Sequence, residues 1–411
     1  MTVPQPTGES RPEHPATRED PATREPQAGH LASLPTVMRE WGRIGCIGFG
    51  GPPAHIALLR KLCVDRNRWL DAQEFEDAIA ACNLLPGPAS TQLAIFCAWR
   101  VRGRLGALAG GTAFIVPGLI VILALSVLFL AGTPPLWVRG AGAGAGAAVA
   151  AVAVQAGWSL VPPSWKRAAG SRRLRWIAYL LAGGAAAATL GPWLVLVLLG
   201  CGAIELAAQH AGQDARAHGI LAAPLLASGA LASGVLLSVA WVAFKVGALS
   251  YGGGFVIIPL MQSDAVNHYH WMTSAEFLNA VALGQVTPGP VVQTVAVVGY
   301  AAAGLVGGLF ASLVAFSPSF AFILFGASRF DRIRDNRHAQ GFLAGAGPAA
   351  IGAILGSAIP LARALTQPWQ YAVLAAALIL LLALRRGVVL TLVSAGVVGT
   401  VIAVAGGPLP H

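Results

Sequence analysis

Long apolar stretches dominate this chain. Residues 105–131, 219–242 and 387–405 contain no charged residue, and each is close to the roughly 20 residues that an α-helix needs to cross a bilayer. Hydrophobic residues make up 56% of the 411 residues and charged residues only 11%, with a mean hydropathy of +0.67; soluble domains carry roughly 25% charged residues. The stretches lack the alternation of β-barrel strands. The sequence therefore predicts an all-α polytopic membrane protein.

The N-terminal segment has a different composition. It is rich in Pro, Thr, Glu and Arg, contains the sequence PATRE twice, and lacks the apolar core of a cleavable signal peptide. Low hydrophobicity combined with many charges predicts disorder. We therefore predict a disordered tail over residues 1–35, a first membrane repeat over 36–218 and a second over 219–411.

The two predicted repeats share motifs at a constant spacing. At an offset of 202 residues, RIGCIGFGGPP aligns with KVGALSYGGGF, and Pro86-Gly87-Pro88 aligns with Pro288-Gly289-Pro290. A one-residue slip near position 100 then aligns GAGA at 144 with GAGP at 345. Internal repeats of this kind are common in transporter folds. The pattern predicts a fused duplication.

Basic residues indicate how the repeats are oriented. The segment 60–68 contains four Lys or Arg and its equivalent 262–270 contains none, whereas 329–337 contains four and the corresponding part of the first repeat, AGTPPLWVRG at 131–140, contains only Arg139. Lys and Arg mark cytoplasmic loops. Equivalent loops are therefore predicted on opposite sides of the membrane, as in two inverted-topology repeats.

Each Pro-Gly-Pro interrupts apolar sequence, and proline ends a helix because it lacks an N–H and clashes with the preceding turn. The basic clusters at 60–68 and 100–104 are predicted on the same side, although only about 30 residues separate them. A hairpin that turns at Pro-Gly-Pro would return the chain to that side. Both copies are therefore predicted to be re-entrant, with broken helices at the Gly-rich and Pro-Gly-Pro motifs; proline-kinked spanning helices are the alternative.

The residues around these breaks are hydrogen-bond donors. A helix that begins after Pro-Gly-Pro presents unpaired N–H groups and the positive end of its dipole, and glycine-rich segments add N–H groups at close approach. Donors without fixed carboxylates suit a small oxyanion. The candidate substrate-binding residues are Gly48, Gly50, Gly51, Pro86, Gly87, Pro88, Ser90, Thr91, Gln92, Gly252, Gly253, Gly254, Pro288, Gly289, Pro290, Gln293 and Thr294.

Two cations and two acids complete the candidate set. Arg43 and Lys245 occupy equivalent positions, and Lys245 lies among apolar residues, where a charge is costly. The two could neutralise a dianion; for Arg43 the alternative is snorkelling to the surface. Glu74 and Glu276 fit capping boxes at helix starts, with proton coupling as the alternative role.

Other classes of site are not indicated. The five Cys have no CxxC spacing and are interpreted as packing residues, so neither a disulfide framework nor a metal site is predicted. P-loop, GxSxG and HExxH motifs do not occur. We therefore expect a secondary transporter in a lipid bilayer, without a cofactor and without a nucleic-acid partner.

Four motifs, GFGGPPAHIALLR, NLLPGPASTQLA, SYGGGFVIIPL and GQVTPGPVVQTVAVVGY, resemble the chromate ion transporter family in its long, two-domain form. The resemblance covers residues 36–406. It implies efflux of chromate from the bacterial cytoplasm, chromate resistance, and energy from the membrane potential or the proton gradient, with sulfate as the structural analogue and competitor. By matching motif positions, it places function on residues 48–53, 86–92, 252–254 and 288–294. Gly254 and Phe255 stand where the first repeat has Pro52 and Pro53, so the two sites need not be equivalent.

Several alternatives stay open at this level. A sulfate or other oxyanion importer, an anion channel and a membrane-embedded enzyme are the rival functions. The predicted location is the bacterial inner membrane, multi-pass, with the tail in the cytoplasm. The number of spans, between about 10 and 13, and a homodimer are left open.

Overall fold

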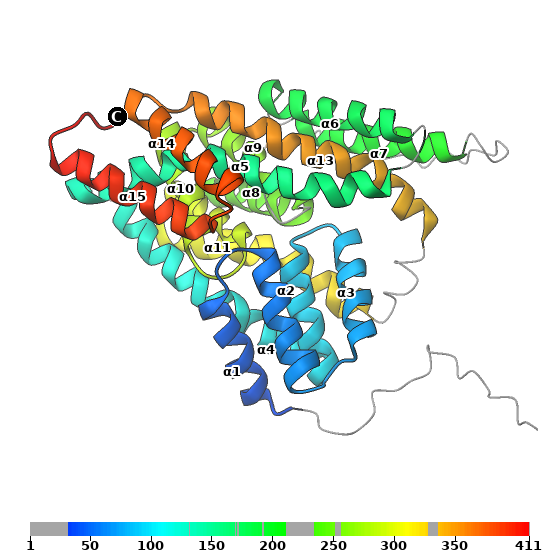
Figure 1. Ribbon diagram of the computed structural model, residues 1–411. Coiled ribbons are helices and arrows are strands. Elements are labelled where there is room, and N and C mark those ends of the chain that lie inside the picture. Colours follow the sequence, from blue (N-terminus) through cyan, green and yellow to red (C-terminus); the bar gives the residue numbers. More distant parts are fainter. Residues whose placement is uncertain are drawn as a thin grey trace, which may run out of the picture. The chain divides into compact units, whose positions relative to one another are not determined.

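The computed structural model describes residues 32–130, 132–168, 170, 172–190, 193–210, 234–250, 256–327 and 336–410, and these form helices without a strand (Figure 1). Four described segments are long and apolar enough to cross a membrane: α4 (Ala89–Phe129), α5 (Leu136–Arg167), Val291–Gly326 and α13 (Arg337–Arg363). Shorter apolar helices are α7 (Leu194–His210), α8 (Val235–Leu249), α14 (Pro368–Leu378) and α15 (Val388–Val404). The all-α polytopic class is confirmed. The predicted tail up to residue 31 and the predicted repeat boundary at 218 lie outside the described residues.

The two repeats open with the same series of elements. The first has α1 (Leu34–Ile47), α2 (Pro52–Arg60), a π-helical turn η2 (Lys61–Arg66) and α3 (Ala72–Leu84). The second has α8, α9 (Ile257–Gln262), a π-helical turn η4 (Ser263–His268) and α10 (Ser274–Val286). Even the π-helical turns recur at the same offset, as expected for a duplicated unit.

Each Pro-Gly-Pro separates two helices. α3 ends at Leu84 and α4 begins at Ala89; α10 ends at Val286, and a 3₁₀ turn, η5 (Val291–Gln293), leads into α11 (Thr294–Gly326). α3 packs against α4 and α10 packs against α11, so the chain folds back at each break. We call residues 86–88 the first tip and residues 288–290 the second tip.

A second break divides each long helix. Arg102 and Gly103 have φ angles of −145° and +61°, and Ala303 and Gly304 have −150° and +61°. With ψ near −153°, the Gly103 conformation is open almost only to glycine. The breaks are 201 residues apart, so the predicted one-residue slip has already occurred before them. Each long helix thus has a short arm that completes the hairpin and a longer arm beyond the break.

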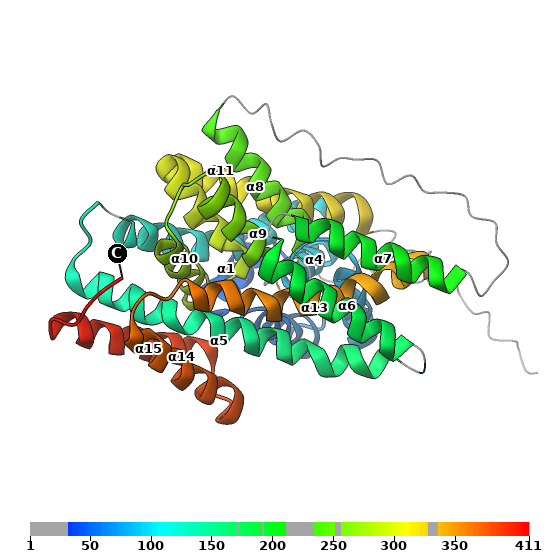
Figure 2. The same ribbon diagram turned by 90° about the horizontal axis from the view of Figure 1, so that it is seen from above.

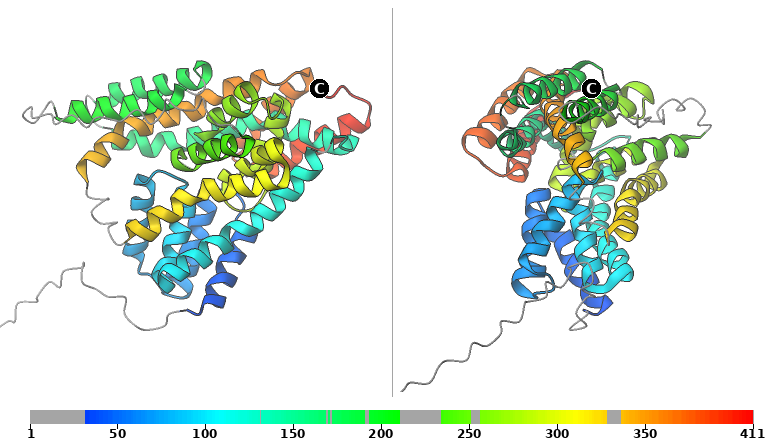
Figure 3. Two further views of the ribbon diagram at one scale, coloured as in Figure 1. Left: turned by 180° about the vertical axis from the view of Figure 1, so that it is seen from behind. Right: turned by 90° about the vertical axis from the view of Figure 1, so that its right-hand side faces the viewer.

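The remaining helices pack as a group. α13 lies along α5, α6 (Arg172–Thr189) and α7, while α14, a π-helical turn η7 (Ile379–Ala383) and α15 line the other side of α5 (Figures 1 and 2). α11 connects the repeats by packing against both α4 and α8 (Figure 3). The largest fully buried side chains include Trp41, Phe75, Phe114 and Phe277. This packing buries the second tip together with Gly87 and Pro88 of the first tip, whereas Pro86 is exposed.

Candidate functional site

Close helix contacts fix the helices that lead to the tips. A Cβ atom added at Gly45 of α1 would lie 2.5 Å from the Phe114 carbonyl oxygen of α4, and one added at Gly247 of α8 would lie 2.0 Å from the Ala315 carbonyl oxygen of α11. Small residues permit such approach between membrane helices. The two contacts are equivalent in the repeats, so the ends of α1 and α8, up to Gly48 and Ser250, are placed in the same way.

The tips are held by main-chain hydrogen bonds between the repeats. The Gly87 N–H of the first tip donates to the Ser250 carbonyl of the second repeat, with N and O 3.1 Å apart. The Gly289 N–H of the second tip donates to the Gly48 carbonyl of the first repeat, at 3.0 Å. Gly48 and Ser250 are themselves equivalent positions. Each tip is therefore built by both repeats, and the exchange between them is reciprocal.

Buried polar groups surround the first tip. Gln92 donates its Nε2 to the Pro86 carbonyl at 2.7 Å, which leaves its Oε1 atom without a partner among the described residues. A Cβ atom added at Gly87 would lie 3.3 Å from Ser319 Oγ of α11. That hydroxyl is also buried without a hydrogen bond to a described residue. Residues from both repeats thus converge on Gly87.

The second tip has a related environment. Gln293 donates its Nε2 to the Ile115 carbonyl of α4 at 2.7 Å, and its Oε1 atom is again buried without a described partner. A Cβ atom added at Gly118 would lie 2.1 Å from the Pro288 carbonyl oxygen and 2.5 Å from Gln293 Oε1. Gly118 is equivalent to Ser319 after the slip. The first tip therefore faces a hydroxyl where the second tip faces a glycine.

His55 links the glycine-rich segment to the helix behind the first tip. Its Nε2 atom lies 2.9 Å from the Gly48 carbonyl oxygen and its Nδ1 atom lies 3.3 Å from Ser90 Oγ. Because a carbonyl only accepts, Nε2 carries the proton, and in the neutral ring Nδ1 accepts from Ser90. The buried ring also makes an edge contact with Phe114. Its second-repeat equivalent is Ile257, so this support belongs to one side only.

Six buried polar atoms in the described part of the chain have no hydrogen-bond partner there. They are Thr91 Oγ1, Gln92 Oε1, Ser250 Oγ, Gln285 Nε2, Gln293 Oε1 and Ser319 Oγ. All lie in or beside the motifs that the duplication repeats. Buried polar groups are otherwise almost always paired, so a cluster of unpaired ones indicates a place for a polar ligand. Three hydroxyls and one amide N–H can donate to oxyanion oxygens, and the two amide oxygens can accept from water or from a protonated anion.

The structure gathers many of the predicted site residues and adds others. It brings Gly289 to Gly48 and Gly87 to Ser250. It also places Gly51 against Val291, where a Cβ atom added at Gly51 would lie 3.6 Å from Val291 Cγ2. Gly252, Gly253 and Gly254 lie outside the described residues. Thr294 is less available, because its hydroxyl already donates to the Val291 carbonyl at 2.9 Å.

Three site features were not predicted. Ser319 and Gln285 contribute buried unpaired atoms, and the Ser250 carbonyl receives the first tip. A signal for Ser319 was present, since Pro117-Gly118 and Pro318-Ser319 are a further repeated pair at an offset of 201 residues.

The two predicted cations differ in their surroundings. Lys245 Nζ lies 2.6 Å from Asp264 Oδ2 and over the Trp241 ring, 5.5 Å from its centroid. Its charge is therefore balanced by an acid that the sequence analysis did not single out. Arg43 is exposed. A role for either residue at the anion site stays a prediction.

The paired acids begin helices, as predicted. Thr273 and Glu276 form a reciprocal capping box at the start of α10, whereas at α3 Asp71 caps the Glu74 N–H without the return bond. Instead, Glu74 forms an ion pair with Arg100, on the short arm of α4. Capping is thus confirmed, fully at one helix and by half at the other; proton coupling stays a prediction.

Comparison with known proteins agrees with this architecture. The family model described as chromate transporter matches residues 36–206 and 237–400. A chromate transport protein of Cupriavidus metallidurans is 30% identical over 347 residues, covering 82% of this chain and 86% of the relative. One of Pseudomonas aeruginosa is 29% identical over 352 residues, covering 80% and 82%, and a probable chromate transport protein of Synechococcus elongatus is 27% identical over 339 residues, covering 80% and 85%. No solved structure matches the chain.

Proposed function

Because the chain belongs to the chromate transporter family, we propose that it is a secondary carrier that exports chromate across the bacterial inner membrane. The proton gradient or the membrane potential drives export, which confers resistance to chromate. Chromate is a tetrahedral dianion, and sulfate, which has the same shape and charge, competes for the site.

The observation that carries this proposal is the cluster of unpaired buried polar atoms at the two tips. Thr91, Ser250 and Ser319 offer hydroxyls within apolar surroundings, and no described carboxylate is hydrogen-bonded to any of them. Such a site favours an anion of high oxygen content over a cation or an apolar molecule, because donors are what the buried groups supply. The tips join both repeats, so movement of one repeat relative to the other would change the site.

The inverted arrangement belongs to the same proposal. The reciprocal hydrogen bonds between Gly87 and Ser250 and between Gly289 and Gly48 are consistent with a twofold relation between the repeats, and the opposite distribution of basic loops supports an axis in the membrane plane. Under this arrangement both tips are re-entrant, the basic segments at 60–68, 100–104 and 329–337 face the cytoplasm, and the N-terminal tail lies there too.

Transport in everted membrane vesicles tests the function. An exporter accumulates radiolabelled chromate in such vesicles, and we expect accumulation to fall with added sulfate. Nigericin and valinomycin, which collapse the proton gradient and the potential separately, identify the driving force. Robust sulfate flux without chromate flux would overturn chromate as the substrate.

A pair of threonine variants tests the site. Thr91→Val removes a buried hydroxyl that has no described partner, and Thr391→Val removes one that already donates to the Gly387 carbonyl. A hydrogen bond to a charged ligand contributes about 1.5–3 kcal/mol. We expect Thr91→Val to raise the KM for chromate roughly tenfold or more, and Thr391→Val to leave it unchanged. Equal effects of the two variants would contradict the assignment of Thr91 to the site.

A further inference from the structure

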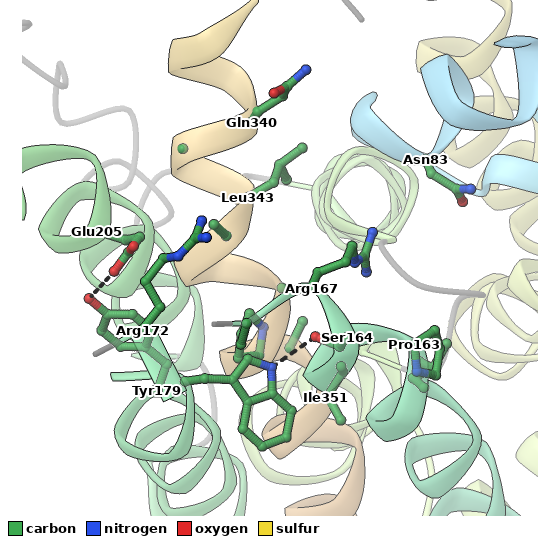
Figure 4. Close-up of a pocket in the computed structure, with 18 of the residues that line it drawn as sticks. Asn83, Pro163, Ser164, Arg167, Arg172, Tyr179, Glu205, Gln340, Leu343 and Ile351 are labelled. Atoms are coloured by element: carbon green, nitrogen blue, oxygen red, sulfur yellow. Dashed lines mark hydrogen bonds between the residues drawn. The ribbon is translucent and has the colours of Figure 1, made fainter. Parts of the chain in front are cut away.

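A cavity of about 1100 Å³ lies beside α3, between that helix and the group formed by α5, α6, α7 and α13 (Figure 4). On one wall, Glu76, Ala80 and Asn83 of α3 face it. These positions are three or four residues apart and so form one helical face. Asn83 lies at the end of α3 and precedes Pro86 by three residues, so the cavity lies along the helix that leads into the first tip.

Three arginines line the cavity: Arg167 at the end of α5, Arg172 at the start of α6 and Arg337 at the start of α13. None of the three forms an ion pair with a described residue. In the view of Figure 4, Arg172 lies on the side of Glu205 and Tyr179, and Arg167 lies between these residues and Asn83.

The acids that line the cavity are already neutralised. Glu76 pairs with Arg60, and Glu205 pairs with Arg175 through two hydrogen bonds of 2.7 and 3.1 Å, with further bonds from Tyr179 and Gln209. The lining therefore carries an excess of positive charge, which raises the local concentration of anions.

The equivalent face of the second repeat is mostly closed, with a smaller cavity of about 340 Å³ beside Leu278 at the start of α10. Leu278, Ala282 and Gln285 of α10 correspond to Glu76, Ala80 and Asn83 of α3. Leu278 and Ala282 are each 3% exposed, whereas Ala80 and Asn83 are exposed.

The closed face packs on glycines of α5. A Cβ atom added at Gly142 would lie 2.9 Å from Asn279 Nδ2, and one at Gly146 would lie 3.1 Å from Leu278 Cβ. After the one-residue slip, Gly142 and Gly146 correspond to Leu343 and Gly347 of α13, and both of these line the open cavity. The contacts between α10 and α5 are thus made, whereas the equivalent positions of α3 and α13 are separated by the cavity.

From this asymmetry, and from three arginines that pair with no described acid, we infer that the cavity beside α3 is the open access path of the carrier, and that Arg167, Arg172 and Arg337 form an anion-collecting vestibule in front of the first tip. The occupant is a small tetrahedral oxyanion in free solution. The path beside α10 is the equivalent path in its closed form. This inference rests on the proposed function for its transported ion, but the vestibule itself is tested without transport.

Thiol labelling of matched alanines tests the open and closed paths. In full-length protein whose five native cysteines are replaced, Ala80→Cys and Ala282→Cys place the same small side chain at equivalent positions. We expect a negatively charged methanethiosulfonate to modify the first at least tenfold faster than the second. The pair Asn83→Cys and Gln285→Cys repeats the comparison should one alanine variant fail to fold. Equal rates in both pairs would overturn the one-sided opening.

The charge of the vestibule is tested on the same background. At Ala80→Cys we measure the rate of modification by an anionic methanethiosulfonate divided by the rate with a cationic one. This ratio is expected to fall roughly tenfold in the triple variant Arg167→Gln, Arg172→Gln, Arg337→Gln. The fall is expected to be smaller at ~1 M salt than at ~0.05 M salt, because salt screens the charges. The control triple variant Arg139→Gln, Arg385→Gln, Arg386→Gln alters arginines that do not line the cavity and is expected to keep the ratio. An unchanged ratio in the first triple variant would overturn the anion-collecting role.

A last experiment distinguishes a free anion from a lipid headgroup as the ligand of the arginines, since both present phosphate-like oxygens. In nanodiscs of neutral lipid, sulfate is expected to slow labelling at Ala80→Cys by the anionic reagent. Slowing by added cardiolipin alone, with none by sulfate, would assign the arginines to lipid and overturn the vestibule. None of these readouts depends on chromate flux, so a failure of the transport assay leaves them interpretable.

Discussion

The ion pair of Lys245 and Asp264 shows how a single charge is kept inside this protein. The two side chains are 15% and 8% exposed, and their charged atoms lie 2.6 Å apart. Removing one partner of a buried pair leaves an uncompensated charge and costs on the order of 3–5 kcal/mol, whereas replacing both by apolar residues is often near neutral. We expect Lys245→Met and Asp264→Leu each to lower the melting temperature, and the double variant to recover most of the loss, as followed by tryptophan fluorescence.

The double variant also decides whether Lys245 serves the anion site. With its fold recovered, the protein would show an increased KM for chromate if Lys245 contacts the ion. An unchanged KM would limit Lys245 to a structural role. A double variant as unstable as either single variant would show that the two residues do not compensate each other.

At the scale of elements, the contacts at Gly45 and Gly247 set how closely each first helix approaches the long helix of its own repeat. Because an added Cβ would meet backbone oxygen in both cases, relief requires the helices to separate. We expect Gly45→Ala and Gly247→Ala each to cost about 1–3 kcal/mol of stability and to lower transport, since the separation moves the tips. Gly200→Ala in α7 is the matched control, because its added Cβ meets no atom within 4 Å. Destabilisation by Gly200→Ala of the same size would show that any helical glycine is sensitive.

The breaks inside α4 and α11 call for a different substitution. Gly103 and Gly304 have open space where a Cβ would lie, so a side chain there is opposed by backbone conformation alone. We expect Gly103→Ala and Gly304→Ala to cost about 1–3 kcal/mol each, with similar values because the φ/ψ pairs are nearly identical. The measurement is the midpoint of thermal unfolding of each purified variant. A neutral effect of both would show that the helices tolerate continuity through the break.

At the scale of the whole molecule, the repeats are interlocked and do not merely lie in series. α11 packs on α4, α10 packs on α5, and each tip is bonded to the other repeat. We expect residues 1–218 and 219–411, co-expressed as separate chains, to purify together through a tag on either one. Each half alone would expose the apolar surfaces that the other covers and is expected to aggregate. Recovery of a soluble, monodisperse single half in detergent would contradict this interdependence.

The sequence by itself determined the class of protein, the duplication and the two tips. Apolar length dictates membrane helices because the bilayer leaves backbone groups no other partner. Proline and glycine dictate breaks because they change which backbone conformations are accessible. Those effects are local, so Pro86, Gly87, Pro288 and Gly289 were found from their own neighbourhood and from the repeat. The capping roles of Glu74 and Glu276 were predicted for the same reason.

Only the tertiary structure decided which groups meet. Asp264 beside Lys245, Ser319 beside Gly87, and the Ser250 carbonyl beneath the first tip join residues from distant parts of the chain. The sequence presents the repeats as related but not identical, and only the fold shows an open cavity along α3 and a mostly buried counterpart along α10. That difference depends on how two nearly symmetric halves pack in one state. The residues of the two faces already differ, with Glu76 where the second repeat has Leu278, but whether each face lies open or buried depends on what packs against it.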